Sequence, residues 1–130
     1  MRYDGDAWNV VDSPILNQSQ SVSSLELVPG TDGRVVWFVG ANGTVMRLEN
    51  GSFSGPWSIG SEAISEVSFA SAENGWAVGQ NGFLAHWDGS NWNVEASPTQ
   101  AALSSLVMVP LMDGWAVGAG GTILRYQPIP

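Results

Sequence analysis

The chain of 130 residues has no cysteine, no lysine and a single histidine. The lack of cysteine excludes disulfides, so packing and hydrogen bonds must stabilise the fold. A zinc site would have to combine one imidazole with carboxylates, a ligand set that zinc sites seldom use. We therefore expect no metal site and no cofactor.

Charge and long apolar runs are also scarce. Charged residues make up 12% of the chain, and the net charge is −8. A surface of this sign repels a phosphate backbone, so we expect no nucleic acid partner. No apolar run approaches the ~18 residues of a membrane span, and the N-terminal MRYDGDAWNV lacks the apolar segment of a signal peptide. We expect a soluble chain without membrane contact, in a compartment that the sequence leaves open.

The chain is rich in glycine and tryptophan, with 16 and 7 residues, and it repeats itself. The segments WFVGANGTVMRL, WAVGQNGFLAHW and WAVGAGGTILRY follow one another at intervals of 39 residues. Three columns of anchor residues share this interval: Trp37, Trp76 and Trp115; Gly40, Gly79 and Gly118; and Gly43, Gly82 and Gly121. Separate columns in phase indicate a structural repeat of about 40 residues.

Each repeat is expected to form four short β-strands. Short apolar or alternating runs are separated by Gly, Asn, Asp and Pro, and none has a helical period. The QNG and DGSN segments of the second repeat predict tight turns between antiparallel strands. Repeated four-stranded meanders are typical of β-propeller blades. We assign blade 1 to residues 22–60, blade 2 to 64–95 and blade 3 to 103–126, within a single propeller segment of residues 1–130.

The third repeat lacks its fourth strand, and a matching strand lies at the other end of the chain. The segment YDGDAWNV from Tyr3 repeats WDGSNWNV from Trp87. We expect residues 1–12 to form an outer closure strand, with Tyr3, Trp8 and Val10 as its key residues. Propellers typically have four to eight blades, so we predict a homodimer of six blades in which this strand completes the last blade of the partner chain. The alternative is a piece of a longer propeller.

These repeats carry a family resemblance. The segments GWAVGQNGFLAHWDGSNW and GWAVGAGGTILRY resemble the blades of bacterial β-propellers similar to the photosystem II stability and assembly factor, a group related to the BNR or Asp-box propellers. The turn WDGSNW is similar to a degenerate Asp-box. The resemblance implies a non-catalytic scaffold.

Basic side chains recur near the end of the third strand of each blade, at Arg47, His86 and Arg125. In a ring, they would form an array that binds anions, carboxylates or an acidic protein loop. The alternative is that they form the solvated face of an alternating strand. The turns between the second and third strands present Asn42, Gln80 and Asn81, whose amides suit a sugar or peptide ligand.

The first strand of each blade is expected to line a central channel with small polar side chains. These are Ser23, Ser24, Glu26, Ser65, Glu66, Ser68, Ser104 and Ser105. Their character suits a channel filled with water.

The sequence favours a non-catalytic binding or scaffold module that acts in protein interaction or assembly. The alternative is an oligomeric lectin with one sugar site per blade. A sialidase-like glycoside hydrolase is a remote alternative, because Tyr3 and Tyr126 fall on the outer side of a blade, away from the channel where that chemistry takes place. Neither a Gly-x-Ser-x-Gly motif nor a phosphate-binding loop is present. We therefore expect no catalytic residues, and protein or glycan as the ligand.

Overall fold

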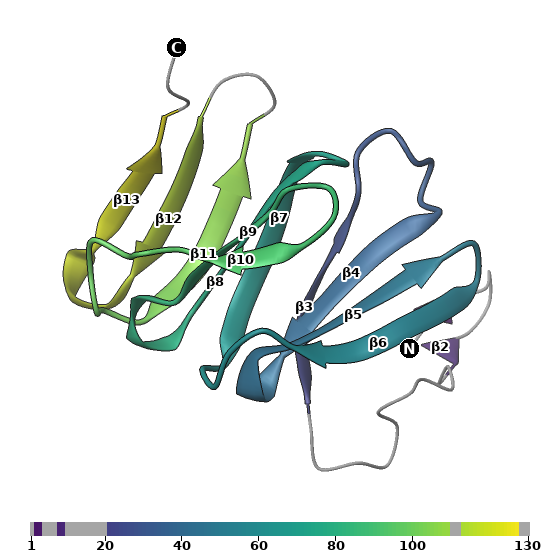
Figure 1. Cartoon of the computed structure of the whole chain (residues 1–130), viewed down its shortest axis with the longest axis horizontal. Coiled ribbons are helices and arrows are strands. Elements are labelled where there is room, and N and C mark those ends of the chain that lie inside the picture. Colours follow the sequence, from purple (N-terminus) through teal and green to yellow (C-terminus); the bar gives the residue numbers. More distant parts are fainter. Residues whose placement is uncertain (1, 4–7, 10–20, 110–112, 128–130) are drawn as a thin grey trace.

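The computed structural model describes residues 2–3, 8–9, 21–109 and 113–127. These residues form β-strands joined by loops and three one-turn 3-10 segments, with no α-helix among them. Three antiparallel sheets follow one another across the molecule (Figure 1). This arrangement confirms the all-β fold built of propeller blades. None of the helical segments in the described ranges has the length or hydrophobicity to span a membrane.

Each sheet takes its strands in chain order, so that neighbours in sequence are neighbours in space. Blade 1 consists of β3 (Val22–Leu27), β4 (Val35–Gly40), β5 (Thr44–Glu49) and β6 (Ser52–Ser58). Blade 2 consists of β7 (Ile64–Ser71), β8 (Asn74–Gly79), β9 (Leu84–Trp87) and β10 (Trp92–Val94). Blade 3 has three strands in the part of the chain that the structure describes: β11 (Leu103–Met108), β12 (Gly114–Gly118) and β13 (Ile123–Tyr126).

A separate hairpin stands near the N-terminus. It consists of β1 (Arg2–Tyr3) and β2 (Trp8–Asn9). In the view of Figure 1 this hairpin appears on the same side of the molecule as blade 1, and β13 lies at the opposite end.

The first strands of the blades lie next to one another. Strand β7 contacts both β3 and β11, whereas the fourth strands β6 and β10 lie at the periphery. Blades of a propeller surround a central channel, and the strands in contact with both neighbours are the ones closest to it. We call β3, β7 and β11 the inner strands.

The turn between the second and third strands is the same in every blade. It is a 3-10 turn, η1 (Ala41–Gly43), η2 (Gln80–Gly82) or η3 (Ala119–Gly121). Its middle residue is left-handed, with φ of 56° at Asn42, 56° at Asn81 and 66° at Gly120. Asparagine and glycine tolerate this conformation better than other residues. Backbone geometry therefore accounts for the residue type at these three positions.

The first glycine column exists because two backbones approach closely at this point. A Cβ atom on Gly40 would lie 1.8 Å from the carbonyl oxygen of Ser21, and one on Gly79 would lie 2.1 Å from that of Ala63. The same carbonyl oxygens accept hydrogen bonds from the residues that follow the two glycines, at 3.1 and 3.0 Å. No side chain fits between these backbones, so the inner strand and the turn can be joined only through glycine.

The turn WDGSNW of blade 2 is fixed by its aspartate. One Asp88 carboxylate oxygen accepts hydrogen bonds from the backbone N–H groups of Asn91, at 2.8 Å, and Ser90, at 2.9 Å. These bonds hold the pKa of Asp88 below its usual value. The motif is thus explained as a side-chain-capped turn that places Trp87 opposite Trp92.

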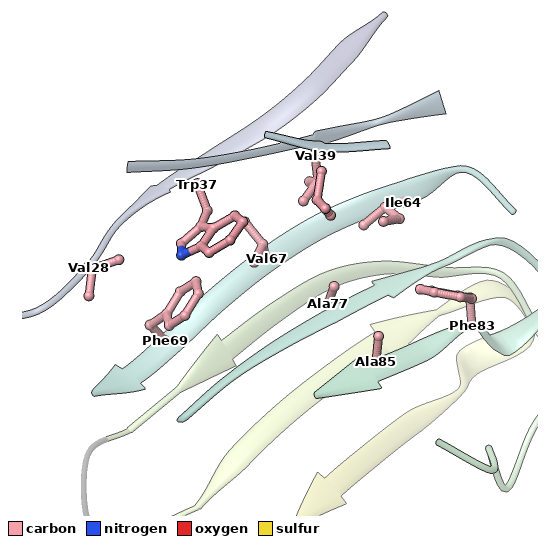
Figure 2. Packing of buried hydrophobic residues seen from close by; sticks show 10 residues of the cluster. Val28, Trp37, Val39, Ile64, Val67, Phe69, Ala77, Phe83 and Ala85 are labelled. Carbon is pink, nitrogen blue, oxygen red and sulfur yellow. The ribbon is translucent and has the colours of Figure 1, made fainter. Parts of the chain in front are cut away.

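The largest core lies between blades 1 and 2. Trp37 of β4 is 2% exposed, and its ring stacks on Phe69 of β7 with 6.3 Å between the centroids. Figure 2 shows both rings between the sheets, with Val39 and Ile64 further along the same interface. The other buried members are Val28, Val45, Val67, Ala77, Phe83 and Ala85. Because each fully buried large apolar side chain contributes about 1.5–3 kcal/mol, this interface is the main source of stability among the described residues.

The core between blades 2 and 3 is smaller. Its buried members are Val78, Leu103 and Ala116. Partly buried Leu84, Leu106 and Leu124 pack around them. The two interfaces are formed by corresponding residues, because the repeat places these residues on corresponding strands of each blade.

Candidate functional site

A hydrogen-bonded chain on the inner strands links all three blades. The Ser68 hydroxyl of β7 accepts a hydrogen bond from the Met108 backbone N–H of β11, at 3.0 Å. The same hydroxyl interacts with the Glu26 carboxylate of β3 and lowers the pKa of that carboxyl. Ser68 is 4% exposed. A buried hydroxyl with partners in both neighbouring blades fixes their relative position, because moving either blade would leave a polar group unpaired.

Two further contacts cross from blade 1 to blade 2. The Ser24 hydroxyl donates to the Glu66 carboxylate, at 2.5 Å, and the Ser23 hydroxyl donates to the Ile64 carbonyl oxygen, at 2.7 Å. We call the five polar side chains of these contacts the inner row: Ser23, Ser24, Glu26, Glu66 and Ser68. Glu26 and Glu66 are half-buried. Each carboxylate offers about four acceptor positions, so the inner row can accept further hydrogen bonds from a ligand.

The two carboxylates of the inner row interact. Burial raises the pKa of Glu26, the hydrogen bond with Ser68 opposes that rise, and the negative charge of Glu66 adds to it. A positively charged ligand group beside the pair would relieve this repulsion. The chemistry of the inner row is therefore that of an acceptor for cations and for N–H donors.

The sequence predicted small polar side chains on the inner strands, and the structure places the inner row there. What the sequence did not reveal is that these side chains join adjacent blades. The signal was present in the alternation of Ser and Glu on β3 and β7, but their pairing depends on how the blades stack.

The three basic residues each lie over a tryptophan. The Arg47 guanidinium lies 5.7 Å from the Trp37 ring centroid, and the Arg125 guanidinium lies 5.2 Å from that of Trp115. The strands pair these residues directly across the sheet, and they pair His86 with Trp76 in the same way. The centroids of these last two rings are 4.6 Å apart. Cation–π contacts of this kind stabilise by about 0.5–1 kcal/mol at exposed sites.

Each basic residue also has a polar partner on its own blade. Arg47 forms an ion pair with Glu49 at 3.1 Å, and Arg125 forms one with Asp113 at 2.8 Å. The ring nitrogen Nε2 of His86 lies 2.8 Å from the Asn74 side-chain oxygen. Cross-strand register also places each of them against an aromatic ring, in addition to any contact with solvent.

The ring-like array of Arg47, His86 and Arg125 stays a prediction. Each residue belongs to a different blade, and among the described residues no interaction joins one to another. The inner row differs in this respect, since its hydrogen bonds already bring residues of different blades together.

The amides of the second-to-third-strand turns are occupied in different ways. Asn81 donates its side-chain amide to the Glu62 carboxylate, whereas at Asn42 it is the backbone carbonyl oxygen that accepts from the Ser58 hydroxyl, at 2.9 Å. Gln80 is exposed. The third blade has Gly120 at the corresponding position, so an asparagine amide is not repeated there. Ligand binding by Asn42, Gln80 and Asn81 stays a prediction.

The closure residues Tyr3 and Trp8 lie on β1 and β2 and pair with each other. Val10 lies outside the described residues. Strand β2 thus has β1 as its partner in this single chain, and its predicted pairing with another chain remains to be tested.

The fold is that of β-propeller blades, and solved structures with a similar fold are known. A YCF48 from Cyanidioschyzon merolae has a TM-score of 0.70 and 18% sequence identity, with 86% of this chain and 38% of that chain covered. A YCF48 bound to a D1 peptide has a TM-score of 0.67 and 19% identity, with 84% and 37% covered. The chain therefore spans less than two fifths of the length of either. Comparison with family models and with curated proteins gives no match.

Proposed function

We propose that this chain is a non-catalytic binding module whose inner row contacts a basic peptide segment of another protein. The observation that carries the proposal is the inner row itself, in which Glu26 and Glu66 stand half-buried among serine hydroxyls. A lysine or arginine side chain of a peptide would pair with these carboxylates, and its backbone N–H groups would donate to the remaining oxygens.

The rigidity of the inner row supports this proposal. Its side chains already hold one another across blades 1 and 2, through the contact of Ser24 with Glu66, and Ser68 is held by the Met108 backbone N–H of blade 3. A ligand that binds pre-positioned groups loses less free energy to ordering them. The net charge of −8 favours a partner of positive charge, because complementary charge speeds association.

The comparisons support a binding role in general terms. One of the similar structures is a YCF48 bound to a D1 peptide, and the repeats of this chain resemble those of the photosystem II stability and assembly factor family. The basic peptide and the inner row as its site are our own extension, which rests on the geometry of this chain.

The geometry around the histidine supports a non-catalytic role. His86 contacts Asn74 and packs against Trp76. General base catalysis by this imidazole would require a nucleophile or substrate proton within hydrogen-bond reach. Among the described residues, the side chains that contact its ring through a hydrogen bond or ring packing are an amide and an indole, and neither acts as a nucleophile.

The proposal can be tested with two peptides of equal length, one rich in Lys and Arg and the other rich in Asp and Glu. We expect isothermal titration calorimetry to detect binding of the basic peptide alone, and the affinity to fall as salt is raised. The double variant Glu26→Gln, Glu66→Gln keeps the shape of the site and removes its charge. We expect it to weaken binding by about tenfold, in line with the loss of charge-assisted hydrogen bonds.

A matched control is Glu95→Gln, which removes an exposed carboxylate that follows β10, outside the inner row. We expect it to bind the basic peptide like the parent chain. An equal loss in the control would show that net charge alone attracts the peptide, and binding of neither peptide would refute the proposal.

A further inference from the structure

An apolar cavity of about 140 Å³ lies between blades 2 and 3. Its lining includes Trp76 of β8, Met108 of β11 and Tyr126 of β13. These residues correspond by repeat position to Trp37, Phe69 and Trp87 at the interface of blades 1 and 2. The position of the cavity therefore has an equivalent at the interface of blades 1 and 2.

At the earlier interface this place is filled by a tryptophan of the fourth strand. Trp92 of β10 packs edge-on against Trp37, with 5.6 Å between the ring centroids. It also lies 6.1 Å from Phe69 and 5.7 Å from Trp87. Blade 3 has no fourth strand in the part of the chain that the structure describes, so the cavity lies where a tryptophan at the position of Trp92 would pack.

The second glycine column, Gly43, Gly82 and Gly121, also shows that the space beside blade 3 is open where it is filled in blades 1 and 2. A Cβ atom on Gly43 would lie 2.3 Å from the carbonyl oxygen of Gly60, and one on Gly82 would lie 1.9 Å from that of Thr99. Gly60 and Thr99 follow the fourth strands of their blades. At Gly121 of blade 3 nothing lies within 4 Å. Blade 3 thus leaves room for a fourth strand and for the segment that follows it.

The chain itself carries a strand of matching design. In the hairpin of β1 and β2, Tyr3 pairs with Trp8 and Arg2 pairs with Asn9. In the hairpin of β9 and β10, Trp87 pairs with Trp92 and His86 pairs with Asn93. The two hairpins share their register, and a Ser-Pro pair follows the tryptophan at the same spacing in both, at Ser13 and Ser97.

We propose that β2 of a second copy of this chain adds to β13 as the fourth strand of blade 3, with Trp8 in the cavity beside Trp76. The register of blade 2 places Trp8 opposite Tyr126 and Asn9 opposite Arg125, and β2 exchanges β1 for β13 as its partner. The donor is a second copy because β2 and β13 lie on opposite sides of the molecule (Figure 1), too far apart to pair within one copy.

The end faces of the chain fit the same assembly. Blade 1 exposes Val22, Leu25 and Leu27 of β3, each at 44% or more. Blade 3 exposes Trp115, Val117 and Ile123, each at 41% or more. Inside the chain the corresponding side chains cover each other: Ile64, Val67 and Phe69 pack against Trp37, Val39 and Val45. Two copies joined in both directions cover both faces, and the six blades of their described residues are within the usual range of propellers.

The first test is light scattering of the full chain. We expect a mass of twice 13.8 kDa at tens of micromolar, and a monomer for Trp8→Ala. The matched control is Trp57→Ala, which removes an exposed tryptophan from the fourth strand of blade 1 and should remain dimeric. A monomeric parent chain, a larger assembly than two copies, or a dimer that survives Trp8→Ala would overturn the proposal.

The second test determines the register of the two strands by disulfide cross-linking. Because the chain has no native cysteine, only the introduced cysteines can react. Register partners in adjacent strands have Cα atoms roughly 4.5–5.5 Å apart, within the range of a disulfide. A mixture of Asn9→Cys chains with Arg125→Cys chains should therefore give a covalent heterodimer under mild oxidation. Asn9→Cys mixed with Ile123→Cys, two residues out of register on the same strand, should not. Equal cross-linking of both pairs, or of neither, would contradict the proposed pairing.

Discussion

The two interfaces between blades are built on the same repeat and differ in how completely they are filled. Trp37, between blades 1 and 2, has four aromatic neighbours: Trp57, Phe69, Trp87 and Trp92. Trp76, between blades 2 and 3, has His86 and Tyr126. The repeat sets the position of each tryptophan, whereas the residues of the following blade decide how deeply it is buried. Stability in a propeller is therefore unevenly distributed among equivalent positions.

Replacing the repeated tryptophans should produce the largest effects on stability. The losses should show how much the equivalent positions differ in their contribution to the free energy of unfolding. We expect Trp37→Ala to lower the free energy of unfolding by about 3–5 kcal/mol, as for a large aromatic side chain removed from a core. Trp76→Ala should cost less, and Trp115→Ala, at an exposed end face, about 1 kcal/mol or less. Urea denaturation in the Trp8→Ala background would measure all three, since we expect blade 3 to stay open there. Equal losses at Trp37 and Trp115 would refute the comparison.

The glycines of the second column offer a matched pair with a smaller effect. Gly82 and Gly121 both have left-handed φ, 74° and 76°, so alanine at either position costs about 1–2 kcal/mol of backbone strain. Gly82→Ala should cost about 1–3 kcal/mol more, because its Cβ atom would collide with the Thr99 carbonyl oxygen. Denaturation of the two variants in the Trp8→Ala background measures the difference directly. If the two losses are the same, the space around Gly121 is not open in solution.

The sequence was sufficient to predict the fold, because the glycine and tryptophan columns each have a local physical cause. Asn42 and Asn81 adopt left-handed turns, and Gly40 and Gly79 lie against a backbone carbonyl. Such constraints act within one repeat, so a sequence pattern records them. The blade architecture follows from them without knowledge of the packing.

The site was harder to predict, because it depends on contacts between repeats. Ser68 and Met108 are separated by 40 residues and meet only when β7 and β11 stack. The partners of Arg47 and Arg125 depend on cross-strand register, which places each over a tryptophan. Residue type identified these side chains as polar or charged, but it did not indicate what each one touches.

The hydrogen bond of Ser68 can be tested next. Ser68→Ala should lower the free energy of unfolding by about 1–3 kcal/mol, because it leaves the Met108 N–H buried without its acceptor. Ser104→Ala is the matched control, since Ser104 is exposed on β11 and its hydroxyl makes a longer contact, 3.4 Å from the Val117 carbonyl oxygen. Thermal or urea denaturation should find the control within about 0.5 kcal/mol of the parent chain. Equal effects of the two substitutions would show that Ser68 does not join blades 2 and 3.

The smallest effect concerns the pH dependence of stability at Glu26. Burial raises the pKa of this carboxyl above the usual value that applies in an unfolded chain. Between these two pKa values the folded state binds more protons than the unfolded state, so this group makes the free energy of unfolding fall as pH rises through that window. Glu26→Gln should remove that contribution and leave the protein at least as stable as the parent at neutral pH. The effect is modest because Glu26 is half-buried and solvent screens its charge. Urea denaturation between pH 4 and 7 would measure it, with Glu73→Gln, an exposed carboxylate outside the inner row, as the control for net charge. If the stability of Glu26→Gln depends on pH as that of the parent chain does, burial between the inner strands does not disfavour the charged form of Glu26.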